Sequence, residues 1–352
     1  MERAMKNRLK KKQVRRRTLS KMQDETSLYE VIRGKRVLYV ATKNRDYIRV
    51  NQEIDIIKKL SSSYSIIAFN DKKYLSRVYK VFTRLVKIKA SEYDVIVIGF
   101  MAQIVACMFP QKFKNNIIVT DFFISIYDTL VCDRKKIRQR TFVASILKWI
   151  DRYTIKNSDY LIVDTIAHGQ YFVDELGANL DKIYVCYLKA DTSIYYPQKI
   201  EKPDEYRDKF LVVYFGSILP LQGVDIVMET VKLLENEKSI HFIIIGPIGN
   251  KMNRFTGDTV TYIDWLSQKE LATYIAFSDL CLAGHFSGDI DKANRTIPGK
   301  AYIYKAMNKK MVLGKSQANY ELFEEDENTF FVERGNAYQL MKLIKERSCD
   351  GK

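Results

Sequence analysis

The sequence contains few of the residues that build metal centres and disulfide frameworks. Its 352 residues include three histidines and five cysteines. No two of the cysteines have CxxC spacing; they are Cys107, Cys132, Cys186, Cys281 and Cys349. Scattered thiols of this kind indicate a reducing compartment and argue against a zinc site. We therefore expect neither a metal nor a resident cofactor.

Several patterns with a direct functional meaning are also absent. The sequence has no Ser/His/Asp order, no pair of carboxylates at catalytic spacing and no P-loop. The longest uncharged run, residues 95–111, has 17 residues, which is the lower limit for a membrane span. Its β-branched beginning, residues 95–99, predicts a buried strand, and residues 100–109 predict a buried helix. We expect the protein to sit on a membrane rather than cross one.

Positive charge is concentrated at the N-terminus. The net charge is +16, and residues 1–21 hold ten Lys or Arg against the single acid Glu2, a net +9. Residues 1–22 carry a thin apolar stripe but lack the core of a secretory signal. Such a segment fits an anionic membrane surface and predicts a cytoplasmic protein, peripheral at the inner face of the cell membrane. Nucleic-acid binding and a disordered solubilising arm are the alternatives.

The rest of the chain alternates strands with helices. Apolar residues make up 47% and charged residues 28%, which describes a soluble globular chain with room for two domains. Buried strands are predicted at 36–41, 64–69, 95–99, 116–120, 160–164, 182–186, 210–215, 241–246, 260–263, 280–283 and 311–314. Helices are predicted at 51–60, 100–109, 145–156, 168–176, 225–234, 268–277 and 301–307. This alternation is typical of parallel sheets covered by helices on both faces.

A polar stretch with two prolines interrupts the alternation and predicts a linker. The predicted organisation is a basic arm (1–30), an α/β domain (31–195), the linker (196–209) and a second α/β domain (210–352). Two doubly wound, Rossmann-like domains predict a cleft, with ligands at the carboxyl ends of the strands.

Residues 295–310 form the first candidate site. Pro298 and Gly299 precede a predicted helix, and Lys300 lies in its first turn. A helix N-terminus after a Pro-Gly turn presents free N–H groups and a positive dipole end, which suit a phosphate. The alternative is a capped surface helix with a solvated lysine.

The second candidate is residues 214–225, a strand, a loop and a helix start. Gly216 and Gly223 allow close backbone approach, and the helix offers its N-terminus to a phosphate. An ordinary turn between strand and helix is the alternative. Gly246-Pro-Ile-Gly249 is too short for a dinucleotide fingerprint.

Two polar residues of the first domain are further candidates. Asp121 follows the predicted strand 116–120 and is a candidate general base, with a loop-capping aspartate as the alternative. His168 begins a helix near the same edge and is a candidate substrate contact. The alternative is a capping or surface histidine.

In order along the chain, these segments resemble the GT-B glycosyltransferases of the large retaining group, family 4, which includes bacterial polysaccharide enzymes. Segments of the second half that carry the resemblance are 214–225, 243–247, 260–271, 278–283, 297–302 and 321–332. Segments 120–134 and 164–168 of the first half fit as well. The resemblance covers roughly residues 35–345 and leaves the arm outside.

The resemblance implies a metal-independent, retaining transfer of a sugar from a nucleotide-sugar to a glycan or lipid-linked acceptor in cell-surface polysaccharide synthesis. It implies that the second domain holds the donor and the first domain the acceptor, near Asp121 and His168. Lys300 would stabilise the charge of the leaving diphosphate. The other implied donor-binding residues are Gly216, Ser217, Gln222, Gly223, Asp264, Trp265, Arg295, Gly299, Tyr302 and Ile303.

The sequence departs from the family pattern at four of these positions. Many members have Arg and Lys where this chain has Ser217 and Gln222, and a Glu-x7-Glu pair where it has Arg295 and Ile303. Each lost cation removes charge-assisted hydrogen bonds of about 1.5–3 kcal/mol. A second hypothesis is therefore a non-catalytic GT-B-like protein that scaffolds or regulates a partner glycosyltransferase.

Overall fold

The computed structural model describes residues 25–247 and 255–349. It divides the chain into two compact units, with the division between Leu188 and Lys189. Residues 1–24 of the predicted arm and Gly249 lie outside the described residues. Within the described residues, no helix is both long and apolar enough to cross a membrane.

The N-terminal unit is built on a six-stranded parallel sheet with the order β2-β1-β3-β4-β5-β6. The strands are β1 (Arg36–Val40), β2 (Ser63–Ile67), β3 (Val95–Ile98), β4 (Ile117–Asp121), β5 (Tyr160–Val163) and β6 (Ile183–Val185). The helices are α2 (Glu25–Ile32), α3 (Ile48–Leu60), α4 (Tyr74–Lys87), α5 (Gln103–Met108), α6 (Phe142–Lys156) and α7 (Ile166–Tyr171).

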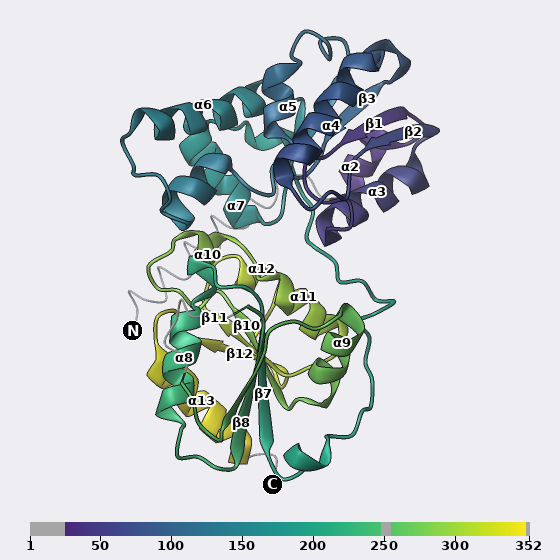
Figure 1. The fold of residues 1–352 in the computed structure, drawn as a ribbon. Coiled ribbons are helices and arrows are strands. Elements are labelled where there is room, and N and C mark those ends of the chain that lie inside the picture. The colour runs from purple at the N-terminus through teal and green to yellow at the C-terminus, as the bar shows by residue number, and fades with distance from the viewer. Residues whose placement is uncertain (1–24, 248–254, 350–352) are drawn as a thin grey trace, which may run out of the picture. The chain divides into compact units, whose positions relative to one another are not determined.

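Helices cover both faces of this sheet, as the continuous apolar strands require. On one face, α2 and α3 pack against alternate strand residues such as Tyr39 and Val97. On the other face, α4 and α5 pack against the intervening residues, such as Leu38 and Ile96. Residues of α6 and α7 extend this second layer over β5 and β6. Figure 1 shows α4, α5, α6 and α7 around this unit.

The C-terminal unit repeats the plan with the strand order β12-β11-β10-β7-β8-β9, again parallel. The strands are β7 (Phe210–Phe215), β8 (Ile240–Ile245), β9 (Val260–Ile263), β10 (Leu280–Gly284), β11 (Met311–Gly314) and β12 (Thr329–Val332). The helices are α8 (Val224–Leu233), α9 (Gln268–Phe277), α10 (Lys292–Arg295), α11 (Gly299–Ala306), α12 (Asn319–Leu322) and α13 (Ala337–Cys349).

One face of the second sheet is covered by α8 and α13. Val227 and Val231 of α8 and Leu340 of α13 belong to a core that also contains Tyr214 and Phe242 from the strands. In Figure 1, α9 and α11 lie on the opposite side of this sheet from α8 and α13. All three strand–helix–strand connections from β9 to β12 run in one direction along the sheet, so α9, α11 and α12 share that other face.

The predicted strands are present with nearly the predicted bounds, β12 was not predicted, and the helix ends shift with their caps. The helix predicted at 145–156 begins at Phe142, because the Thr141 side chain accepts a hydrogen bond from the Ala144 N–H (3.2 Å). The helix predicted to begin at His168 begins at Ile166, after the cap Thr165. The predicted helix 301–307 spans Gly299–Ala306.

The region around the predicted linker packs against the C-terminal unit. Lys202 Nζ donates a hydrogen bond to Asp279 Oδ2 (2.5 Å), and the Tyr206 ring lies 5.0 Å from the imidazole of His241. In the N-terminal unit, Leu28 and Ile32 of α2 are buried, so Leu28, which the prediction assigned to the arm, contributes to that core.

Candidate functional site

Three neighbouring strands of the C-terminal sheet carry a glycine at the carboxyl end. Gly216 follows β7, Gly246 follows β8, and Gly284 ends β10, with φ values of 141°, 135° and 92°. A Cβ on Gly246 would lie 2.1 Å from the carbonyl oxygen of Gly216. Only glycine permits both this approach and these dihedral angles, so the three residues form a line of bare backbone along one edge of the sheet.

The loop from β7 to α8 closes against the segment that follows β10. Gly223 has a φ of 64°, and a Cβ there would lie 2.5 Å from the Ser287 backbone nitrogen. The Phe286 N–H donates a hydrogen bond to the Gln222 carbonyl oxygen (3.2 Å). Gly223 is also the N-cap of the ten-residue helix α8 and provides no capping side chain. The first turn of α8 therefore has N–H groups that a ligand can use.

Lys300 brings a cation to this bare backbone. It lies in the first turn of α11, after Pro298, and its residue is 6% exposed. Its Nζ donates a hydrogen bond to Gln222 Oε1 (2.5 Å) and lies 4.7 Å from the centroid of the Tyr214 ring. Cβ atoms placed on Gly216 and Gly284 would lie 3.3 and 3.1 Å from the same nitrogen. The ammonium group thus lies between two of the edge glycines.

The surroundings of Lys300 neutralise its charge poorly. Burial lowers the pKa of Lys300 to about 7, and no carboxylate counters this effect within the described part of the chain. The nearby Tyr214 hydroxyl is buried and has no hydrogen-bond partner among residues 25–247 and 255–349, and burial raises its pKa. A buried cation and an unsatisfied hydroxyl beside bare backbone are the complement of an anionic, hydrogen-bonding ligand.

The other predicted donor residues differ in how far they are exposed. Ser217 and Gly299 are exposed, on the loop after β7 and at the start of α11. Tyr302 is buried and Ile303 half-buried on α11. Arg295, on α10, is buried and pairs with Asp291 (3.1 Å).

Asp264 and Trp265 follow the carboxyl end of β9. Both are exposed, and Trp265 is 76% exposed. The contacts described above bring together Gly216, Gln222 and Lys300, with Gly223 in the same loop. They do not include Asp264, Trp265 or Ile303.

Sequence reasoning missed Gly284, set Gly246 aside with the segment 246–249, and gave Tyr214 no role of its own within the candidate segment 214–225. The signal in the sequence was that each of three apolar strands is followed by, or ends in, a glycine. This signal indicates a common site only once β10, β7 and β8 are known to be neighbours. It also missed His285, which is 3% exposed, has a φ of 57° and lies with its Nδ1 2.9 Å from the Thr296 carbonyl oxygen. That contact ties the end of β10 to the segment before α11.

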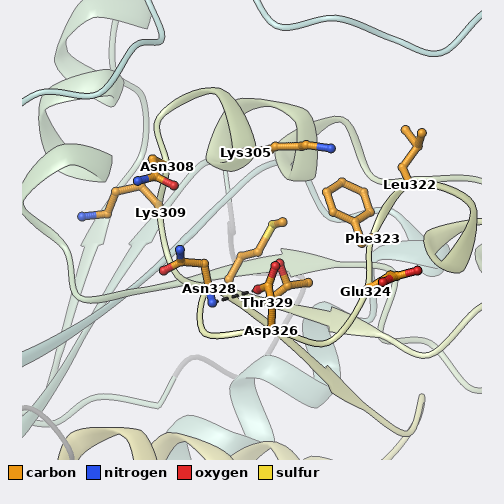
Figure 2. Close-up of a pocket in the computed structure, with 10 residues that line it drawn as sticks. Lys305, Asn308, Lys309, Leu322, Phe323, Glu324, Asp326, Asn328 and Thr329 are labelled. Atoms are coloured by element: carbon orange, nitrogen blue, oxygen red, sulfur yellow. Dashed lines mark hydrogen bonds between the residues drawn. The ribbon is translucent and has the colours of Figure 1, made fainter.

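A hollow elsewhere in the C-terminal unit is distinct from this centre (Figure 2). It has a volume of about 200 Å³ and lies near the first residues of β11 and β12, Met311 and Thr329, whereas the glycines lie at carboxyl ends. Its two lysines are engaged: Lys305 Nζ lies 5.2 Å from the Phe323 ring centroid, and Lys309 Nζ donates to the Ala276 carbonyl (2.8 Å).

In the N-terminal unit, Asp121 lies at the carboxyl end of β4 as predicted, but its carboxylate is fully engaged. Its two oxygens accept hydrogen bonds from Arg49 Nη2 (3.1 Å) and Nε (3.2 Å), and both side chains are buried. Oδ1 also accepts the Phe123 N–H (3.2 Å). Arg49 Nη1 in turn donates to the Cys186 carbonyl (2.8 Å). These contacts favour the loop-capping alternative over a general base.

His168 is buried rather than at the surface. Its Nδ1 lies 2.6 Å from Asp164 Oδ1, and its ring lies 4.3 Å from that of Phe172. Its Nε2 has no hydrogen-bond partner within the described residues. Thr165, not His168, caps α7. A contact of His168 with an acceptor stays a prediction.

Comparison with known proteins indicates which family model, relative and solved structures this chain is similar to. Residues 209–348 match the family model described as glycosyl transferases group 1. Over 215 residues the chain is 22% identical to an uncharacterized 41.2 kDa protein in the cps region of Klebsiella pneumoniae, a match that covers 59% of this chain and 58% of that protein. The matched region thus spans less than two thirds of that relative.

Solved structures agree over nearly the whole chain. The structure is similar to sucrose-phosphate synthase from Thermosynechococcus elongatus (TM-score 0.63, 12% identity, 90% of each chain). It is also similar to HepE from Anabaena in complex with UDP-glucose (TM-score 0.64, 14% identity, 90% of each chain). The fold is GT-B. This confirms the predicted fold class, and the matched family domain supports a glycosyltransferase.

We predict that Gly284→Ala weakens anion binding at the Lys300 centre, because the added Cβ would lie 2.5 Å from Gln222 Oε1 and 3.1 Å from Lys300 Nζ. Gly177→Ala is the matched control: its φ is also positive (76°), but no atom lies within 4 Å of the added Cβ. Both variants should lose about 1–2 kcal/mol of stability from backbone strain. Calorimetry should show that only the Gly284→Ala variant loses affinity for the anion. Equal affinities of the two variants would exclude Gly284 from the site.

We expect Asp121→Asn to act mainly on stability. Removing one partner of a buried ion pair leaves an uncompensated charge and costs about 3–5 kcal/mol. Arg49→Met should lower the free energy of unfolding similarly, and the double variant should recover part of the loss. Denaturant unfolding measures all three. A stable Asp121→Asn protein without transferase activity would restore the general-base interpretation.

Proposed function

We propose that this protein is a glycosyltransferase that moves a sugar from a nucleotide-sugar donor to a glycan or lipid-linked acceptor in cell-surface polysaccharide synthesis. The observation that carries the proposal is the buried Lys300 ammonium, which lies among glycine backbones and lacks a carboxylate partner in the described part of the chain. The cps-region relative and the UDP-glucose bound by the Anabaena neighbour support it.

The diphosphate of the donor is the anion that this centre would take. Lys300 Nζ would meet a phosphate oxygen, and the first turns of α8 and α11 would add N–H donors and positive dipole ends. Gly216, Gly223 and Gly284 let the diphosphate approach the backbone. Asp264 and Trp265 would flank the nucleoside base.

The same groups would act on the transition state. As the bond between the sugar and the diphosphate breaks, negative charge grows on the leaving group. A preorganised cation and amides stabilise that charge more than they stabilise the ground state. Retention of configuration, independence from metal ions and membership of family 4 belong to this proposal.

The acceptor belongs to the N-terminal unit in this proposal, with His168 Nε2 as a contact. A location at the membrane inner face rests on residues 1–22, which lie outside the described residues. The alternative, a scaffold without activity, is favoured by Ser217 and Ile303, which provide neither the cation nor the acid that many family members have there.

We predict that Lys300→Met weakens donor binding at least tenfold, since a charge-assisted hydrogen bond contributes about 1.5–3 kcal/mol and each 1.4 kcal/mol is a factor of ten. Lys309→Met is the matched control, because Lys309 is another lysine of this unit whose pKa burial lowers. Calorimetry with UDP-, GDP-, dTDP- and ADP-sugars measures the affinities. The thermal midpoint of unliganded Lys300→Met should not fall, because Met replaces a desolvated amine.

Three results would contradict the proposal. If no nucleotide-sugar binds the wild type, the scaffold hypothesis is favoured. If Lys300→Met and the wild type bind equally, the donor site lies elsewhere. If a donor binds and wild-type protein with membrane extract forms no glycosylated product, the site binds nucleotide-sugars without transferring the sugar.

Donor affinity should also depend on pH. The pKa of Lys300 is lowered to about 7 in the unliganded protein, and a bound diphosphate favours the charged amine. Binding therefore takes up a proton above pH 7, and affinity should fall as pH rises from 7 toward 9. The diphosphate of a nucleotide-sugar does not titrate there, so calorimetry at several pH values isolates the protein group. Lys300→Met should show a flat profile.

A further inference from the structure

The helix α4 exposes an apolar stripe that no described part of the chain covers. The stripe consists of Leu75, Tyr79, Phe82 and Val86, which lie at positions i, i+4, i+7 and i+11 of the helix. Leu75 is 79% exposed and Tyr79 is 69% exposed. Val81 and Leu85, on the adjoining side of the helix, are buried in the core. The apolar arc of this helix is therefore wider than the part that packs on the sheet, and its outer part lies exposed beside the polar side that carries Lys80 and Arg84.

The helix α6 repeats this pattern. Phe142, Ile146 and Trp149 share one side of it at i, i+4 and i+7, and Phe142 and Trp149 are 81% and 57% exposed. Ala144 and Ile155 are buried on its inner side. Two helices of one unit thus expose large aromatic side chains at helical spacing.

These two stripes belong to one continuous layer. The short helix α5 packs against α6, and the Phe109 ring that follows it lies 5.4 Å from Phe82 of α4. Its own Ile104 and Met108 are exposed. The three helices cover the same face of the sheet (Figure 1), and they carry 11 of the 18 large apolar side chains that are exposed in the described residues. We call their outer surface the apolar–basic face.

The charge of this face is predominantly positive, although Lys148 of α6 pairs with Glu175 (3.2 Å). No acid occurs in residues 72–91, 95–120 or 134–150. The exposed cations on and beside the three helices are Lys72, Lys73, Lys80, Arg84, Lys87, Lys89, Lys114, Arg134, Lys135, Lys136, Arg138 and Arg140. Lys80 pairs with Asp71. The cations border the apolar stripes rather than interrupt them, as on helices that lie in a membrane interface.

We propose that the apolar–basic face binds the surface of an anionic lipid bilayer. Exposed Trp, Tyr and Phe side chains favour the headgroup boundary, where a ring is half in an apolar environment. Lys and Arg bordering them gain from the negative surface potential. The face lies on the N-terminal unit, so it is separate from the Lys300 centre and does not depend on the proposed function.

Charge also argues against two other occupants. Residues 1–21 of this chain carry a net +9 and would be repelled by a face of the same sign. A second copy of the chain, joined through the same face, would bring these cations against one another. An anionic lipid surface has the complementary charge.

The two tryptophans of the chain, Trp149 and Trp265, permit a direct test. In full-length Trp265→Phe protein, Trp149 is the sole tryptophan and lies on the face. Its fluorescence should shift to the blue with phosphatidylcholine vesicles that contain phosphatidylglycerol. It should not shift with phosphatidylcholine alone, and added salt should weaken the shift.

Charge substitutions on the face supply the matched comparison. Tyr79→Glu together with Phe142→Glu should lower the vesicle partition coefficient at least tenfold, because two negative charges then meet the anionic interface. Tyr338→Glu is the control, since Tyr338 lies on α13 of the other unit and is 67% exposed, close to the 69% of Tyr79. Thermal unfolding should show that all variants are folded, because the substituted side chains are exposed.

Several outcomes would overturn the proposal. Binding to anionic vesicles with unchanged Trp149 emission would assign the membrane contact to residues 1–22. An equal shift on neutral vesicles would remove the role of the cations. A shift without vesicles, accompanied by a dimer in sedimentation equilibrium, would make the face an interface between copies. If the protein does not bind anionic vesicles at all, the proposal is wrong.

Discussion

The burial of the Lys300 ammonium without a carboxylate partner is the constraint that gives the C-terminal unit its functional character. Burial of the side chain lowers its pKa to about 7, and its Nζ donates a hydrogen bond to the amide oxygen of Gln222. A cation in such a place destabilises the unliganded protein. The glycines around it add backbone in dihedral regions that other residues rarely adopt. Such strain and unmet polarity are typical of sites that a ligand completes.

The N-terminal unit also buries a cation, but it pairs this cation with a carboxylate. Arg49 is as deeply buried as Lys300, but Asp121 and the Cys186 carbonyl engage its guanidinium. Nearby, Tyr39 donates to Glu53 (2.7 Å), and burial raises the pKa of that carboxyl. This network supplies the countercharge to Arg49 from within the unit. The contrast explains why a carboxylate at a strand end, which suggested catalysis from sequence, is best understood as part of the architecture.

The two units also differ in what they expose. The C-terminal unit has its buried lysine and its positive-φ glycines at the carboxyl edge of its sheet. The N-terminal unit carries aromatic side chains on its outer helices α4 and α6, bordered by cations. A nucleotide-sugar needs a desolvated, preorganised pocket, whereas a lipid surface needs an exposed amphipathic layer. The same parallel-sheet plan can carry either kind of site, because function lies in the residues at edges and outer faces.

Local sequence determined the strands, the order of the elements and the position of Lys300 at a helix start. Short runs of β-branched residues favour buried strands, and Pro298-Gly299 favours the start of a helix, so both features depend on neighbours in the chain. Which residues meet was decided by the tertiary structure. Strand order makes β10, β7 and β8 neighbours, and thereby collects Gly284, Gly216 and Gly246 at one edge. It also joins Arg49 to Asp121, 72 positions apart. Packing likewise decides which part of the apolar arc of α4 is left uncovered, because the arc is wider than the sheet covers and does not specify by itself which part faces the sheet.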